Sequence, residues 1–192
     1  MNESLLLWIN QGWQSPQLDM LFIWLSAKAT FSFPLMLIII VFLGVRFGRP
    51  GWFLGLGMII VAASGDLFGN LLKSIFAQPR PCLEYWDVIR MPRAESTRCM
   101  SSDNGMPSNH ALNFFATFSF LAFFVRRHSF TIAVVVLSSL VALSRVYLGE
   151  HFPSQIAAGS GIGIVYGLTL ALLGKHYFYE KLNIYQEKTK MT

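Results

Sequence analysis

The sequence predicts an all-α fold: a polytopic membrane helix bundle of about six helices, forming one domain over residues 1–192. Composition is the first observation behind this prediction. Hydrophobic residues make up 54% of the chain and charged residues 13%, whereas an average soluble domain is about 25% charged. The second observation is that the apolar residues gather into runs near the ~20 residues that cross a bilayer as a helix. A soluble globular domain is therefore excluded.

Five apolar runs are predicted to span the membrane, and one shorter helix completes the expected bundle. The short helix covers residues 17–28, which are too few to cross alone and are expected to lie tilted, re-entrant or at the interface. No basic segment precedes it, so no cleavable signal peptide is expected. The five predicted spans are 29–46, 52–74, 108–126, 129–147 and 153–174.

The positions of lysine and arginine predict the orientation of the bundle. Basic residues follow the first, third and last spans, which places these three regions in the cytoplasm. The loop 75–107 and the turn at Glu150 are then extracytoplasmic. Part of the net charge of +5 thus reflects the basic residues that keep these loops in the cytoplasm. Nothing in the sequence suggests binding of nucleic acid. The basic residues on the cytoplasmic side are Arg46, Arg49, Arg126, Arg127, Lys175, Lys181, Lys188 and Lys190.

Both cysteines, Cys82 and Cys99, lie in the extracytoplasmic loop. Free cysteines are usually small buried hydrophobes, which would place them within the spans. Their shared position on the oxidising side favours a disulfide, worth about 3 kcal/mol in the chain-entropy estimate, over reactive thiols or a metal site. No metal site is predicted.

A first polar cluster lies at the outer end of the second span. Pro79 and Pro81 prevent the helix from continuing much beyond Gln78. The chain should then turn Arg80 back over the bundle, where Lys73 can reach the same point. Taken alone, the two cations are more simply explained as interfacial side chains that extend toward water.

Asp66 favours a functional interpretation of this cluster. It lies two helical turns below Lys73 on the same face of the predicted helix. An aspartate at membrane depth costs about 2.5–3.5 kcal/mol, so it needs a partner inside the bundle. Lys73 and Arg145 are the cations nearest in depth, and we expect one of them to pair with Asp66.

Two further clusters lie at the ends of other spans. Ser108 is placed as an N-cap of the third span, where free backbone N–H groups and the helix dipole form an anion site beside His110. An ordinary capped helix with an interfacial histidine explains that motif equally well. Arg145 ends one span and His151 begins the next, so both can point into one pocket.

The three clusters together suit phosphoryl transfer without a metal. They place two histidines and three cations at the outer ends of spans, whereas the other two histidines lie on the cytoplasmic side. Lys73, Arg80 and Arg145 could neutralise the charge that develops on the phosphoryl oxygens. Neutral His151 would attack phosphorus, and His110 would protonate the leaving oxygen and then activate water.

These motifs resemble the three signature motifs of the type 2 phosphatidic acid phosphatase superfamily, in order and spacing. The motifs are Lys73 to Pro81, Pro107-Ser-Asn-His110, and Ser144-Arg145 with His151, and the similarity covers roughly residues 50–175. The resemblance implies a six-helix bundle in a bacterial inner membrane, with a site facing the periplasm or exterior. It implies cofactor-free and metal-independent dephosphorylation of a phospholipid or polyprenyl phosphate or pyrophosphate, such as undecaprenyl pyrophosphate.

The resemblance also implies a role for each motif residue. His151 would be the nucleophile and His110 the acid and base. The phosphate-binding residues would be Lys73, Arg80, Ser108, Asn109 and Arg145.

Two positions depart from the family pattern. Asn109 stands where the family usually has glycine, so its side chain could narrow the phosphate cradle. Gln155 stands where the third motif ends in aspartate, four residues after the nucleophilic histidine. A neutral amide can orient the imidazole but hardly stabilises its positive charge, so catalysis could be slow or lost, or rescued by a neighbour such as Glu150.

Three functions therefore remain open at this stage. The leading one is hydrolysis of a lipid phosphate. A second is transfer of the phosphate to another lipid instead of water. A third is a catalytically weak protein that binds or transports lipid phosphates, which Gln155 would favour.

Overall fold

The structure is a computed structural model that describes residues 2–92 and 104–190, with side chains described as far as Lys175. Every regular element in these ranges is a helix, which confirms the predicted fold class. In chain order the elements are α1 (Asn2–Gly12), α2 (Pro16–Leu25), the π-helical turn η1 (Lys28–Ser32), α3 (Phe33–Phe47), α4 (Arg49–Phe76), α5 (Pro81–Glu84), α6 (Asn109–Val125), α7 (His128–Tyr147) and α8 (Pro153–Lys190).

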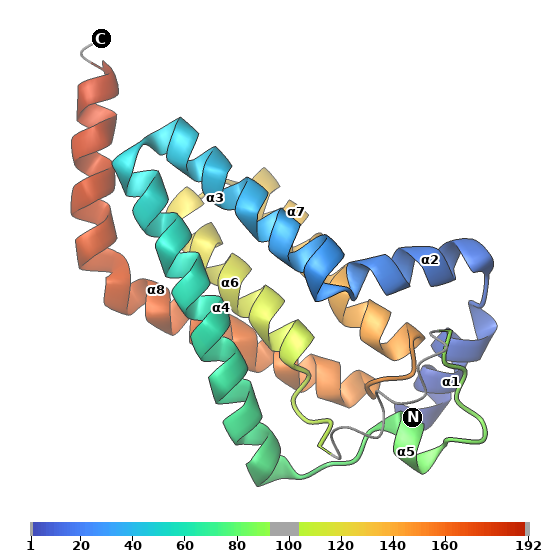
Figure 1. Cartoon of the computed structure of the whole chain (residues 1–192). Coiled ribbons are helices and arrows are strands. Elements are labelled where there is room, and N and C mark those ends of the chain that lie inside the picture. The colour runs from blue at the N-terminus through green and yellow to red at the C-terminus, as the bar shows by residue number, and fades with distance from the viewer. Residues whose placement is uncertain (1, 93–103, 191–192) are drawn as a thin grey trace.

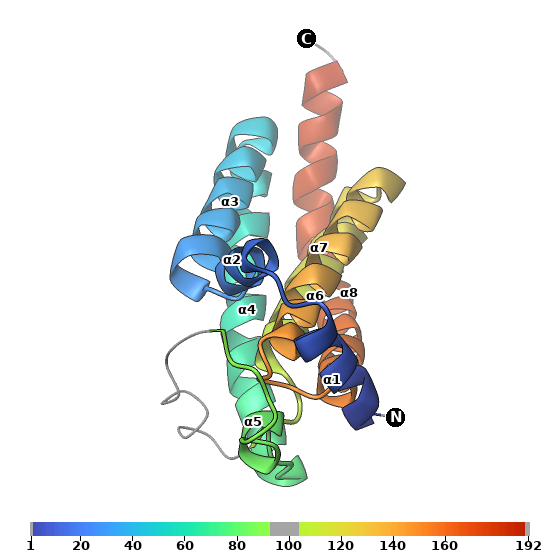
Figure 2. The ribbon, with the colours of Figure 1, turned by 90° about the vertical axis from the view of Figure 1, so that its right-hand side faces the viewer.

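The long apolar helices form a bundle with α6 at its centre (Figure 1). Helix α6 packs against α4, α7 and α8, and α3 packs on α4. Turned by 90°, the bundle shows α3 and α4 as one pair beside the group of α6, α7 and α8 (Figure 2). Within the described residues four segments are long and apolar enough to cross a membrane, and α6 is a shorter apolar helix of 17 residues.

The five predicted spans are thus confirmed as helices. When η1 is counted with α3, their ends lie within three residues of the predicted ones, except that α8 continues as a helix to Lys190. Successive long helices run in opposite directions through the bundle (Figure 1). The end of α4, the start of α6, the end of α7 and the start of α8 therefore meet at one end.

The N-terminal region differs from the prediction of one short helix over 17–28. It contains two helices, α1 and α2, and the second ends at Leu25. Ser15 caps α2 by accepting a hydrogen bond from the Leu18 backbone N–H at 3.2 Å, and Pro16 occupies the first helical position, where its missing N–H costs nothing. Lys28 instead opens η1, which leads directly into α3.

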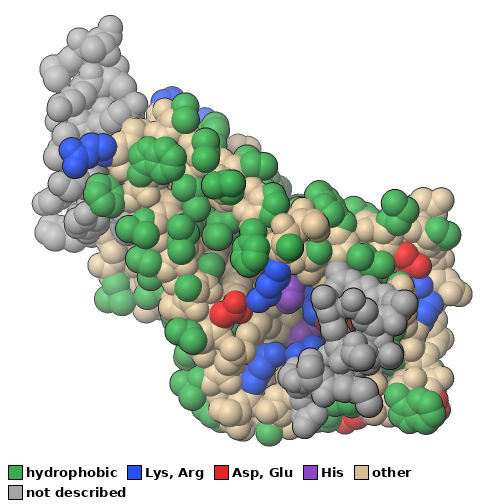
Figure 3. Space-filling model, viewed as in Figure 1, with side chains coloured by type: hydrophobic (Ala, Val, Ile, Leu, Met, Phe, Trp, Pro, Cys, Tyr) green, Lys and Arg blue, Asp and Glu red, His purple; other side chains and the backbone are tan. Residues whose placement is uncertain are grey.

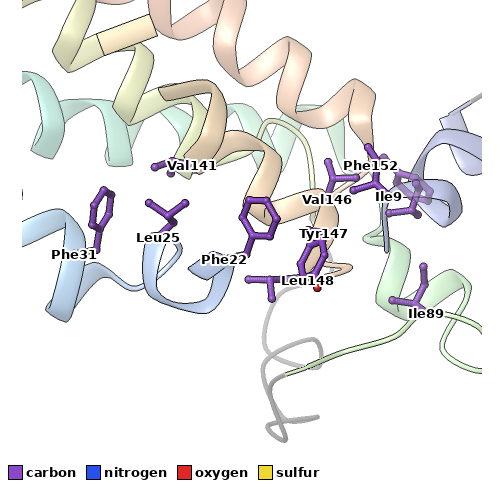
Figure 4. Close-up of a cluster of buried hydrophobic side chains, with 11 residues drawn as sticks. Ile9, Phe22, Leu25, Phe31, Ile89, Val141, Val146, Tyr147, Leu148 and Phe152 are labelled. Atoms are coloured by element: carbon purple, nitrogen blue, oxygen red, sulfur yellow. The ribbon is translucent and has the colours of Figure 1, made fainter. Parts of the chain in front are cut away.

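The two N-terminal helices pack over the end of α7 through an apolar cluster (Figure 4). Ile9 of α1 and Phe22 and Leu25 of α2 are buried there, and the Phe22 ring lies 4.5 Å from the Tyr147 ring, centroid to centroid. This burial explains why short helices that could not cross a membrane are nevertheless held in place.

A polar network fixes the same contact. The fully buried Asn10 side chain donates to the backbone carbonyls of Arg90, at 2.8 Å, and Tyr147, at 2.7 Å. Arg90 binds both oxygens of Asp19, at 3.0 and 2.8 Å, and the Tyr147 hydroxyl donates to Asp19 at 2.5 Å. The hydrogen bonds from Arg90 hold the pKa of the Asp19 carboxyl below its usual value. The network joins α1, α2 and α7 to the chain that follows α5.

Helices α6 and α8 approach each other backbone to backbone along a row of glycines. A Cβ on Gly159 would lie 2.7 Å from the Ser108 carbonyl oxygen, and a Cβ on Gly163 or Gly167 would collide with the next carbonyls along α6. Glycines spaced by four residues lie on one face of a helix and permit such close packing in membranes. This row fixes the start of α8 against the start of α6.

We expect Gly163→Ala to destabilise the protein by about 1–3 kcal/mol, because the new methyl group meets the α6 backbone, which cannot move aside. Thermal unfolding in detergent would measure the loss. Gly161→Ala is the matched control, since nothing lies within 4 Å of a Cβ at that position. It should leave stability unchanged or raise it by up to about 1 kcal/mol through helix propensity. Equal effects of the two substitutions would contradict the close packing.

Candidate active site

The predicted site residues gather at one end of the bundle. Lys73 lies in the last turn of α4, Ser108 and Asn109 open α6, and Arg145 lies in the last turn of α7. His151 lies between α7 and α8. Figure 3 shows histidine and basic side chains clustered at this end, beside a surface of mostly hydrophobic side chains. The three sequence clusters are therefore brought together in space.

His151 is buried in a positively charged environment. Its side chain is 2% exposed, and its backbone N–H donates to the Arg145 carbonyl at 3.1 Å, which holds the two residues of the third motif together. Burial lowers the pKa of the His151 imidazole well below its usual value, and the positive charges of Arg80, Arg145 and Lys73 lower it further. The imidazole is therefore neutral at neutral pH.

Gln155 orients this imidazole. Its Oε1 lies 3.1 Å from His151 Nδ1 and also accepts from the Phe152 backbone N–H at 3.2 Å, while its Nε2 donates to the Pro79 carbonyl at 2.8 Å. The last two bonds fix which way the amide points. Because Oε1 can only accept, Nδ1 carries the proton and the lone pair of the ring lies on Nε2.

Arg145 is held by two side chains. One terminal nitrogen contacts the Ser26 hydroxyl and the other pairs with the Glu150 carboxylate. Rescue of catalysis by Glu150 remains a prediction. Glu150 is the partner of Arg145, because the turn after α7 folds its backbone N–H onto the Arg145 carbonyl at 2.9 Å.

The second motif presents polar groups at the start of α6. Ser108 is the N-cap residue, as predicted, but its side chain makes no capping hydrogen bond. Its Oγ is buried and has no hydrogen-bond partner within the described ranges, so it is available to a ligand. Behind it lie the first-turn N–H groups of α6, which have no partner inside the helix. His110 Nε2 lies 3.2 Å from the Ser26 carbonyl oxygen.

The prediction that Asp66 pairs with Lys73 or Arg145 is wrong. Its contacts are Lys28 Nζ at 3.3 Å, Asn113 Nδ2 at 2.7 Å and Asn109 Nδ2 at 3.4 Å. Lys28 is supplied by η1 and reaches across to α4. Local spacing could not reveal this pair, because the two residues are 38 positions apart on different helices.

The Asn109 side chain faces α4. It donates to the Asn70 side-chain oxygen at 2.8 Å, and its own oxygen would lie 2.5 Å from a Cβ on Gly69. Gly69 therefore makes the space that this asparagine needs. The amide belongs to the polar group formed by Asp66, Asn70 and Asn113.

A cavity of about 360 Å³ extends from this polar group between α3, α4 and α6. Lys28, Asp66, Asn109, His110 and Asn113 line one part of it, and the remaining lining is almost wholly apolar. The cavity thus joins His110 to a hydrophobic space that could hold the hydrocarbon part of an amphipathic ligand.

Two residues that contact the site were missed by sequence reasoning, Ser26 and Lys28. Both belong to the connection between α2 and α3, far from the three motifs in sequence. Neither carries a local pattern that marks it as functional, because their contacts with Arg145, His110 and Asp66 cross 119, 84 and 38 residues.

The predicted disulfide remains a prediction. Cys82 is buried at the start of α5, whereas Cys99 lies outside the described residues. We expect mass mapping under non-reducing conditions to recover one peptide that contains both residues from protein isolated from an oxidising compartment. Two free thiols in such a sample would rule the pairing out.

Fold and site together define a membrane-embedded helix bundle that collects cations, a buried neutral histidine and a helix N-terminus at one end. The profile of the PAP2 superfamily matches residues 50–178, and the chain belongs to that family. The predicted resemblance to the type 2 phosphatidic acid phosphatases is thereby confirmed. The N-terminal helices, with Ser26 and Lys28, lie outside the matched residues.

Relatives and a solved structure agree with this assignment. The chain is 29% identical over 166 residues to phosphatidylglycerophosphatase B of Bacillus subtilis, a match covering 82% of this chain and 73% of that protein. It is 30% identical over 124 residues to dolichyldiphosphatase of Saccharomyces cerevisiae, covering 59% of this chain and 46% of the yeast protein. The crystal structure of a transmembrane PAP2-type phosphatidylglycerolphosphate phosphatase from Bacillus subtilis superposes with a TM-score of 0.67 at 23% identity, covering 91% of this chain and 86% of that one. That similarity shows the fold.

Proposed function

We propose that this protein removes phosphate from a lipid phosphate or diphosphate through a phosphohistidine formed on His151. The enzyme class, a membrane phosphatase of lipid substrates, follows from membership of the PAP2 superfamily and from its named relatives. The observation that carries the mechanism is the buried neutral imidazole of His151. Its Nδ1 is held by Gln155, and it sits in the field of three cations.

In the first step the lone pair of His151 Nε2 attacks phosphorus and the bond to the leaving oxygen breaks. Lys73, Arg80 and Arg145 neutralise the phosphoryl oxygens, and Ser108 Oγ with the first-turn N–H groups of α6 completes the cradle. His110 gives its proton to the leaving oxygen. In the second step His110 takes a proton from water, which attacks the phosphohistidine and releases inorganic phosphate.

We place the site at the extracytoplasmic face of a bacterial inner membrane. The turns between α3 and α4 and between α6 and α7 lie at the opposite end of the bundle (Figure 1), and they carry Arg46, Arg49, Arg126 and Arg127. Short loops rich in arginine stay in the cytoplasm. A phosphate presented at the outer leaflet would then reach His151 without crossing the bilayer.

A second candidate is a protein that binds lipid phosphates with little turnover, and Gln155 is the observation that favours it. A lipid-to-lipid phosphotransferase would use the same first step with a lipid hydroxyl in place of water. Release of inorganic phosphate from several lipids by detergent-purified protein separates the three: hydrolysis releases it, transfer moves it to an added lipid alcohol, and binding alone does neither.

We expect phosphate release to continue in EDTA at the rate seen without it. Lys73, Arg80 and Arg145 supply the positive charge that magnesium provides in many phosphoryl-transfer enzymes. Rates would be compared in EDTA and in added magnesium on one preparation. An absolute requirement for magnesium would contradict the mechanism.

A further inference from the structure

The connection between α2 and α3 forms a wall of the site that the family motifs do not include. The Ser26 carbonyl oxygen lies 3.2 Å from His110 Nε2, and the Ser26 hydroxyl contacts Arg145. Two residues later, Lys28 lines the cavity that His110 also lines, and its ammonium group pairs there with Asp66. Lys28 is therefore anchored, through its own backbone, next to the proposed acid.

From this position we infer that Lys28 binds the phosphate of a lipid diphosphate that stays attached to the lipid and departs with it. Lys28 would thereby select lipid diphosphates over lipid monophosphates. The inference rests on the proposed function. It assigns to Lys28 the leaving-group side of the reaction, whereas Lys73, Arg80 and Arg145 act on the phosphoryl group that is transferred.

The direction of the reaction determines which side Lys28 serves. His151 attacks in line, so the leaving oxygen points away from His151 and toward His110, which protonates it. Lys28 lines the cavity on the His110 side and is within electrostatic range of Lys73. The first group beyond the leaving oxygen is therefore assigned to the polar part of the cavity lining, to which Lys28 and His110 both belong.

Lys28 can change partners. Its ion pair with Asp66 spans 3.3 Å, and the two side chains are 51% and 38% exposed, so the pair is a weak one. Asp66 also accepts a hydrogen bond from Asn113, at 2.7 Å, on its other oxygen, so Lys28 is not its only partner. In the absence of substrate, Asp66 thus holds the Lys28 ammonium group at the cavity through a weak ion pair, which a phosphate group can replace.

The two leaving groups differ in the negative charge that they gather, so the Lys28 ammonium group can stabilise one more than the other. When a diphosphate reacts, the bond from His151 Nε2 to the terminal phosphorus forms as the bridging P–O bond breaks. The departing lipid monophosphate takes the electron pair and gathers negative charge, which an ammonium group stabilises directly. When a monophosphate reacts, the leaving group is a lipid alkoxide that depends on the proton of His110.

The test compares a farnesyl diphosphate with a farnesyl monophosphate in detergent, so that the hydrocarbon part is constant. The readout is kcat/KM for the diphosphate divided by kcat/KM for the monophosphate, measured on one preparation. This ratio does not depend on the fraction of folded protein. Lys28→Gln should lower this ratio by about tenfold or more, through the diphosphate. Lys28→Arg, which keeps the charge, should restore most of it.

Two controls sharpen the result. Lys175→Gln removes a lysine from the other end of the bundle and should leave the ratio unchanged. Asp66→Asn frees Lys28 from its ion pair and should keep or raise the ratio. If Lys28→Gln lowers both activities equally or neither, or if Asp66→Asn lowers the ratio as much as Lys28→Gln, the inference fails. Wild-type protein inactive on both lipids would instead overturn the proposed function.

Discussion

His151→Ala is expected to abolish phosphate release from every lipid substrate, a loss of more than about 10³-fold. The substitution removes the nucleophile. No other side chain in the described site is a neutral imidazole that Gln155 orients for attack. Steady-state release of inorganic phosphate measures the loss, and thermal unfolding of the variant checks that the bundle is intact.

His110→Ala should give a different outcome. Attack by His151 can still occur on a substrate with a good leaving group, but no base remains to activate water. A brief incubation with radiolabelled substrate, quenched at high pH, should therefore trap an acid-labile phosphoprotein. The same label found in His151→Ala would show that another residue is the nucleophile.

Substitutions at Gln155 have the second large expected effect. Gln155→Ala removes the acceptor at His151 Nδ1 and leaves the ring free to turn, which should lower kcat by about 10- to 100-fold. Gln155→Asp supplies a negative charge that stabilises the positive phosphohistidine, so kcat should rise while KM stays nearly constant. Unchanged activity in Gln155→Ala would mean that Gln155 does not orient the nucleophile.

The pH dependence of Gln155→Asp provides a separate check. In the wild type, burial and the neighbouring cations lower the His151 pKa, so the ring stays neutral and active well below the usual histidine range. A carboxylate beside it favours the protonated form and raises the pKa. The acid limb of kcat/KM, where activity falls as pH falls, should therefore move to higher pH. The aspartate also lacks the donor that meets the Pro79 carbonyl, which should cost about 1–3 kcal/mol of stability.

The parts of the structure that the sequence predicted are those with a local physical signature. Apolar runs of bilayer length predicted the long helices, because an apolar run is costly to expose to water whatever its packing partners are. Prolines, an N-cap serine and paired cations at the ends of these runs marked the three motifs. Their convergence followed from the alternating direction of the spans, since every second end lies on the same side of the membrane.

The parts that were missed depend on contacts between distant segments. Helix α1 has too few apolar residues to resemble a span, and it is held in place by the burial of Leu6 and Ile9 and by the hydrogen bonds of Asn10 to distant segments. Lys28 seemed to end an interfacial helix, whereas it begins η1 and pairs with Asp66. No spacing rule relates these positions, so only the three-dimensional packing could reveal them.

The contacts of the N-terminal helices set the order in which the protein can be completed during synthesis. Asn10 bonds to Tyr147, 137 residues further along, and Asn2 bonds to Ser154, 152 residues further along. At a translation rate of ~5–20 residues per second, α1 waits roughly 7–30 s for its partner to be made. Ser26 likewise meets His110 and Arg145 only after most of the chain has been inserted. A nascent chain that already spans the membrane several times therefore still lacks the contacts of Ser26 with His110 and Arg145, which form only when the first-made segment packs onto the later helices.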